Sequence, residues 1–149
     1  MSLSNASEND LLLLLFNNTN WANLGDATGV RGSTTAGSFF ISLHTADPGE
    51  AGTQTTSEAT YTGYARVAVA RSSGGWTVSG TAPTQAANAA TITFGACTAG
   101  SNTITHFVVG RDTSGTGEII ASGALTASLS VSAGITPSFA IGALTVTAD

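Results

Sequence analysis

From Phe39 onwards, short runs of alternating apolar and polar residues recur between turn residues, and no helical period continues through them. Alternation with a period of two places successive side chains on opposite faces of a strand. The runs 90–94 and 125–131 are especially regular. We therefore expect an all-β chain of about eight antiparallel strands, and the jelly-roll β-sandwich is the common form of that size. The expected strands lie near 39–44, 64–70, 75–79, 90–94, 104–109, 118–121, 125–131 and 139–146.

The alternation also predicts which side chains share a face. In the first expected strand Phe39, Ile41 and Leu43 lie on one face, and Ser38, Phe40, Ser42 and His44 lie on the other. In the last expected strand the apolar positions change parity at Gly142. This change predicts a β-bulge or a bend at that glycine.

Residues from about 4 to 18 are expected to form a short α-helix. A serine at position 4 or 7 can cap its amino end, acidic residues at 8 and 10 suit the positive end of the helix dipole, and leucines have good helix propensity. Leu11, Leu14 and Leu15 would form one apolar stripe along this helix. Leu12, Leu13 and Phe16 extend that stripe most of the way round. Such a helix has to be buried, either under its own sheet or in a neighbouring subunit, and the sequence leaves both possibilities open.

Charged residues are scarce, at 9% of the chain, and the net charge is -5. The four basic residues are all arginine, with no lysine. Because the chain has no basic stripe to neutralise phosphates, we expect no nucleic-acid partner. The absence of lysine also excludes catalysis through a lysine Schiff base and phosphate binding by the lysine of a P-loop. Solubility then depends on Ser, Thr, Asn and Gly, which suits contact with other protein surfaces.

Cysteine use and hydropathy limit the class of protein further. Cys97 is the single cysteine, which excludes an internal disulfide and a cysteine-rich zinc site, and we expect it to be a small apolar residue near a strand end. The apolar run 11–16 is far shorter than the roughly 20 residues that cross a membrane, and its acidic flank does not fit a secretory signal. We expect one domain over 1–149, a soluble protein made in the cytosol, with no membrane partner.

Two connections are too long for simple hairpins. The stretch 20–37 links the helix to the expected sandwich at 38–149, and 46–63 separates the first two strands. Loops of this length in a compact domain are usually functional or mobile. Their residues carry no specific chemistry, so we interpret both as docking loops in preference to active-site loops.

One group of residues has the composition of a metal site. His44, Asp47 and Glu50 lie close in sequence, and a histidine with two carboxylates can bind a divalent cation. The segment Asp47-Pro48-Gly49 is also a ready turn signal. We favour the turn and expect neither metal nor cofactor.

The remaining candidate sites have structural explanations that we favour. His106 shares strand parity with apolar neighbours, so a half-buried, hydrogen-bonded histidine is expected in place of a catalytic base. No serine lies in a G-x-S-x-G elbow, no glycosidase pair is evident, and the glycines of 110–117 fit a loop or hairpin turn. We therefore assign no catalytic residue and expect no enzyme. Four aromatic residues are interpreted as core or interface anchors, with a sugar-stacking platform as the alternative: Trp21, Tyr61, Tyr64 and Trp76.

Several short motifs follow one another across essentially the whole chain. Their order and spacing resemble a family of small tailed-bacteriophage virion proteins, namely capsid cement or decoration proteins, and similar sequences are often described as tail-fibre proteins. The 20–37 connection is longer than this resemblance implies. The motifs are Leu3-Ser4-Asn5, Phe16-Asn17-Asn18-Thr19, the segments 41–48 (ISLHTADP) and 63–69 (GYARVAV), and the later segments 90–94 (ATITF), 104–107 (ITHF) and 142–147 (GALTVT).

The resemblance implies a structural jelly-roll protein that binds the outer surface of the phage capsid and stabilises it. Its implied partners are the major capsid protein and further copies of itself, as a homo-dimer or homo-trimer. The alternative is a tail-fibre or baseplate component that binds host surface glycans. We expect the contacts to come from the helix and the long loops, through Leu11, Leu14, Leu15, Phe16, Trp21, Asp47, Glu50 and Tyr61.

Overall fold

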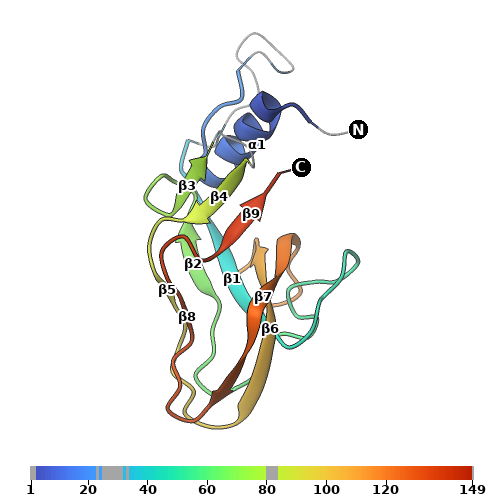
Figure 1. Ribbon diagram of the computed structural model, residues 1–149, viewed down its shortest axis with the longest axis vertical. Coiled ribbons are helices and arrows are strands. Elements are labelled where there is room, and N and C mark those ends of the chain that lie inside the picture. Colours follow the sequence, from blue (N-terminus) through green and yellow to red (C-terminus); the bar gives the residue numbers. More distant parts are fainter. Residues whose placement is uncertain (1–2, 23, 25–31, 33, 80–83, 149) are drawn as a thin grey trace. The chain divides into compact units, whose positions relative to one another are not determined.

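The computed structural model describes residues 3–22, 24, 32, 34–79 and 84–148. Within these residues the chain begins with one helix, and every later element of regular secondary structure is a strand (Figure 1). The all-β class with a short amino-terminal helix is therefore confirmed. The elements are α1 (Asn5–Asn17), β1 (Ser38–His44), β2 (Val67–Ala70), β3 (Trp76–Ser79), β4 (Gln85–Asn88), β5 (Ile92–Thr93), β6 (Ser101–Gly110), β7 (Ile119–Ser132), β8 (Ser138–Phe139) and β9 (Thr145–Thr147).

The strands form three sheets. A four-stranded sheet has the order β2-β1-β6-β7, a three-stranded sheet has the order β3-β4-β9, and β5 pairs with β8. The β1–β6, β6–β7, β3–β4 and β4–β9 pairings are all antiparallel, as expected. The jelly-roll arrangement of these sheets stays a prediction.

The contacts between Cα atoms divide the chain into two compact units. The first unit combines Met1–Ser38, Ala70–Ile92 and Phe139–Asp149, and the second combines Phe39–Val69 with Thr93–Ser138. The first contains α1 and the three-stranded sheet, and the second contains β6, β7 and nearly all of β1 and β2. The expectation of a single domain stays a prediction.

In the first unit, α1 packs against β3 and β4. Ser4 caps the helix through its side chain, which accepts from the Ser7 backbone N–H, and Asn18 ends it in the left-handed conformation. Phe16 is buried edge-on against Trp76, with 4.7 Å between ring centroids. The Arg71 guanidinium donates to two carbonyls of the last helical turn. Of the two possibilities that the sequence left open, the structure places the helix against its own sheet.

In the second unit, the core is built on the paired strands β1 and β6. The apolar face of β1 is buried as expected, and so are Ser42 and His44 on the opposite, polar face. The polar face of this strand end is therefore covered as well, because the connection that follows β1 folds back over it. The other buried apolar residues of β6 and β7 are Ile104, Phe107, Val108, Val109 and Val131.

Strand β7 is longer than the sequence predicts. The expected strands 118–121 and 125–131 are one strand, because Gly123 pairs with Phe107 of β6 and leaves room for its ring. A methyl group at Gly123 would overlap that ring. The register also shifts, since the step from 104 to 106 on β6 faces the step from 129 to 124 on β7. The strand is thus continuous but bulged, and it pairs with β6 as the expected hairpin.

The last expected strand, 139–146, is divided between two sheets. Its first part is β8 and its last part is β9, with Gly142 between them at φ +74°. The predicted bend at this glycine is confirmed. Strand β4 was not predicted because its alanine-rich sequence has weak strand propensity, and it is formed by pairing on both sides. The expected strands 64–70 and 90–94 shorten to β2 and β5.

Candidate interaction surface

The long connection after β1 is held against the second unit by its backbone. The Thr45 N–H donates to the Ser57 carbonyl and the Ala59 N–H to the Leu43 carbonyl, each at 2.8 Å. His44 and Glu58 also form an isolated β-bridge. Residues 57–59 of the connection are therefore bonded to the end of β1, and the connection is not a freely extended arm.

His44 is buried under this connection, and both of its ring nitrogens are bonded. Nδ1 lies 2.8 Å from the Thr56 carbonyl oxygen and Nε2 lies 2.8 Å from the Ser42 hydroxyl. A carbonyl oxygen can only accept, so the neutral ring is assigned with the proton on Nδ1, and Nε2 accepts from Ser42. Burial lowers the pKa of His44 below its ordinary value, and the bond to Thr56 and the nearby Glu58 oppose this effect.

The lowered pKa of His44 predicts a loss of stability in mild acid. The folded state favours neutral His44, so its contribution is complete above the unfolded pKa of 6.5 and is lost as the pH falls below that value. We expect the free energy of unfolding to fall by up to about 1.4 kcal/mol per pH unit there, until the lower folded pKa is reached. Urea denaturation from pH 7.5 to 5 measures this slope. A His44→Gln variant should lose it while a His106→Gln control keeps it, and equal slopes in His44→Gln and the unaltered chain would contradict the assignment.

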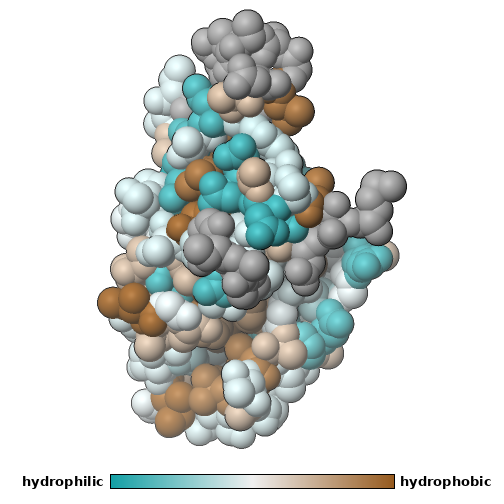
Figure 2. Space-filling view, turned by 45° about the horizontal axis from the view of Figure 1, so that its top comes forward, coloured by the Kyte–Doolittle hydropathy of each residue, from teal (hydrophilic) through white to brown (hydrophobic). Residues whose placement is uncertain are grey.

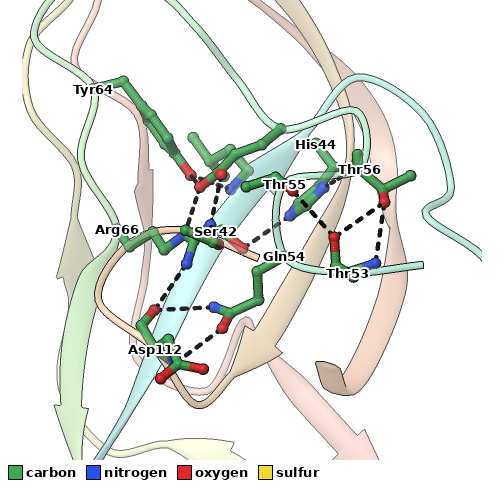
Figure 3. A network of polar contacts seen from close by, with 12 residues as sticks. Ser42, His44, Thr53, Gln54, Thr55, Thr56, Tyr64, Arg66 and Asp112 are labelled. Carbon is green, nitrogen blue, oxygen red and sulfur yellow. Dashed lines mark hydrogen bonds and ion pairs between the residues drawn. The ribbon is translucent and has the colours of Figure 1, made fainter. Parts of the chain in front are cut away.

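Gln54 joins the same connection to the β6–β7 hairpin. Its side chain is fully buried, its Oε1 accepts from the Asp112 N–H at 2.9 Å, and its Nε2 donates to the Asp112 carbonyl at 3.3 Å (Figure 3). Its own N–H donates to the Gly117 carbonyl. The side-chain amide thus pairs with a backbone residue as a neighbouring strand would. Gly110 and Gly117 lack a Cβ where one would overlap Gln54.

Glu58, Tyr64 and Arg66 form the charged part of this anchor. The Arg66 guanidinium donates to both oxygens of Glu58 at 2.7 Å and also to the carbonyls of Asp112 and Gly115. The Tyr64 hydroxyl donates to Glu58 and accepts from the Leu43 N–H. Burial raises the pKa of Tyr64, which keeps this hydroxyl protonated as a donor. In Figure 3, Arg66 and Gln54 converge on Asp112 from two segments of the chain.

We call these eight residues the anchoring network: Ser42, His44, Gln54, Thr56, Glu58, Tyr64, Arg66 and Asp112.

The sequence analysis did not identify Gln54, Glu58 and Arg66 as members of this network. The useful signal was the scarcity of charge, because in a chain with four arginines each one is a candidate for a structural ion pair. The network's donors and acceptors satisfy one another, which gives it a structural role.

The structure separates the residues of the candidate metal set. His44 is buried with both nitrogens bonded, whereas Asp47 and Glu50 are exposed. Asp47 accepts from the Gly49 N–H, which forms the predicted turn. Across the described residues, no group of three His, Cys, Asp or Glu side chains is placed to hold a metal ion. His106 is half-buried and bonded to Thr105 as expected, and Cys97 is buried.

The aromatic residues lie mainly in the interior. Trp76 and Tyr61 are buried, and the Tyr61 hydroxyl donates to the Gly95 carbonyl. Tyr64 packs edge-on against Tyr61 at 5.4 Å and stacks on Phe94 at 6.3 Å. Trp21 is half-buried. The interpretation as core anchors therefore holds for Tyr61 and Trp76, and these two rings offer no sugar-stacking platform.

The predicted contact residues fall into two groups. Asp47 and Glu50 are exposed, and Leu11, Leu14, Leu15 and Trp21 are half-buried, so these six remain predictions. The side chains of Tyr61 and Phe16 are buried at 3% and 1% exposure, because they pack in the interiors of the second and first units. The structure thus gives both residues a place in the core of the chain, and their expected contacts with other chains stay a prediction.

An open groove of about 490 Å³ lies between the turn at 47–52 and the start of β7. Its carboxylates come from Asp47, Glu50 and Glu118, and its apolar wall comes from Ile119 and Ile120. Elsewhere among the described residues, the exposed large apolar residues are Leu3, Leu24, Ile135 and Ile141. On the face seen in Figure 2, hydrophobic areas are separated by broad near-neutral and hydrophilic areas, in keeping with the Ser- and Thr-rich composition.

Comparison with known proteins identifies the family. A family model described as podophage GP4 fiber I protein gp80 matches residues 2–147, which is nearly the whole chain. The chain belongs to this family. It is thus a structural protein of the phage virion, in agreement with the broader part of the resemblance seen in the sequence. No curated protein matches the chain.

The part of the chain that the structure describes contains no helix with the length and hydropathy of a membrane span.

Proposed function

We propose that this chain is a non-enzymatic structural subunit of a phage fibre. The observation that carries the proposal is the match over residues 2–147 to a family described by a fiber protein. This supports the tail-fibre alternative at least as well as the capsid cement hypothesis.

The geometry of the second unit supports a role in adhesion. The buried polar groups are used to hold the connection after β1 and the β6–β7 hairpin in one conformation. Exposed turns carried by such a rigid support are suited to protein contacts, because little conformational freedom is lost on binding. We propose that the chain acts as one of several copies, as a homo-dimer or homo-trimer, so that modest contacts add up through avidity.

Capsid cement is the second candidate. The motif order along the chain and the all-β fold favour it. In that function the chain would bind the major capsid protein on the outer surface of the head and oppose the pressure of the packaged DNA.

Labelling of intact virions separates the two candidates. Gold-labelled antibody against the purified chain is expected to mark the fibres at the tail end of the particle. Labelling of the head would overturn the fibre proposal. In that case, heads that lack the protein should be more fragile to heat and regain resistance when the purified chain is added.

A further inference from the structure

The groove beside β7 lies along an unpartnered sheet edge. In the order β2-β1-β6-β7 the strand β7 is terminal, and within the described residues it pairs with β6 alone. Such an edge leaves backbone N–H and C=O groups available to an added strand. The first residues of β7, Ile119–Ser122, also line the groove. The surface therefore offers backbone pairing and side-chain contacts at one place.

The charges around this edge are acidic. Glu118 pairs with Arg111, and both side chains are more than half exposed. Asp47 and Glu50 stand on the opposite side of the groove, and no salt bridge to either occurs among the described residues. Because the chain has no lysine and a net charge of -5, a like-charged second copy is a poor occupant. Arg66 and Arg71 are committed to contacts inside their own units.

We propose that this groove binds an extended, lysine- or arginine-bearing segment of another virion protein, added as a strand along the start of β7. Its basic side chains would face Asp47 and Glu50, and its apolar side chains would lie on Ile119 and Ile120. The alternating side chains of an added strand suit this division, because they project in turn from the two faces of the extended sheet. One set can face the turn at 47–52 while the other packs beside the apolar side chains at the start of β7. This inference rests on the proposed structural function and specifies the chemistry of the partner.

Peptide binding to the purified chain tests the proposal. The probe is a fluorescent ten-residue peptide of alternating lysine and valine, with a glutamate and valine peptide as its acidic counterpart. We expect only the basic peptide to bind, and more weakly as salt is raised. The double variant Asp47→Asn with Glu50→Gln should weaken its binding about five- to tenfold. An Asp10→Asn variant, which removes a carboxylate of the first unit, should leave the affinity unchanged.

Hydrogen exchange distinguishes the pairing of an added strand from binding through charge alone. Strand addition should slow amide exchange at 118–124 when the basic peptide is bound. Equal binding by the double variant, or protection elsewhere than β7, would overturn the proposal. Because these measurements use the isolated chain, their failure would reject the basic partner and leave the proposed place in the virion standing, whereas head labelling would reject the fibre and leave the groove untouched.

Discussion

Replacing Arg66 with alanine is expected to lower the free energy of unfolding by about 3–5 kcal/mol, because the change leaves a carboxylate without its partner inside the protein. The Arg66 side chain is only 3% exposed and that of Glu58 is 14% exposed. The variant also loses the bonds that Arg66 donates to the carbonyls of Asp112 and Gly115. Chemical denaturation of the purified variant measures the change.

The chain contains a matched control for this experiment. Arg111 and Glu118 also form an ion pair, but their side chains are 60% and 63% exposed. The Arg111→Ala variant should therefore change the free energy of unfolding by less than about 1 kcal/mol. An Arg66→Lys variant should recover only part of the stability, since an ammonium group cannot bond both Glu58 oxygens in the same planar geometry. Equal losses in Arg66→Ala and Arg111→Ala would contradict the structural role of the buried pair.

Replacing Gln54 with alanine is expected to cost about 2–4 kcal/mol. The substitution leaves the Asp112 N–H and carbonyl without their side-chain partners and opens a cavity under the β6–β7 hairpin. Thermal and urea denaturation give the loss. Thr55→Ala, at an exposed neighbouring position of the same connection, is the control and should be close to neutral.

A double-mutant cycle with Gly110 tests the same contact from the other side. In the unaltered chain Gly110→Ala should cost about 1–3 kcal/mol, because its methyl group would overlap the Gln54 side chain. In the Gln54→Ala background that overlap is gone, so the added cost should be clearly smaller. Strict additivity of the two substitutions would show that Gly110 and Gln54 do not share the space that the structure assigns to them.

The sequence was sufficient to predict those elements of secondary structure that a single local signal determines. The Ser4 cap and the leucines predict α1 to within a residue at each end, and the alternation after Ser38 predicts β1. Gly142 correctly marks a change in the path of the chain. The alternation did not reveal β4, since its alanines carry little strand preference and the strand exists because β3 and β9 flank it.

The candidate surface was predictable only in part. Asp47 and Glu50 come from a turn signal and are exposed as a turn should be. Tyr61 belongs to the same connection but is buried, because its hydroxyl reaches the Gly95 carbonyl and its ring packs on Tyr64. Residues of one loop that look alike in sequence thus have opposite exposures, and no local pattern separates them.

The sequence by itself determined the class of the protein: an acidic, lysine-free, all-β chain with a short helix, related to phage virion proteins. These properties follow from composition, from periodicity and from the order of short motifs, all of which are local or additive along the chain. Only the tertiary structure decided that Gln54 bonds to Asp112 and Arg66 to Glu58, and that the turn at 47–52 faces β7. These contacts join segments that are distant in sequence or irregular in structure. Their partners meet only when the strands of the second unit have paired, so no local pattern in the sequence identifies them.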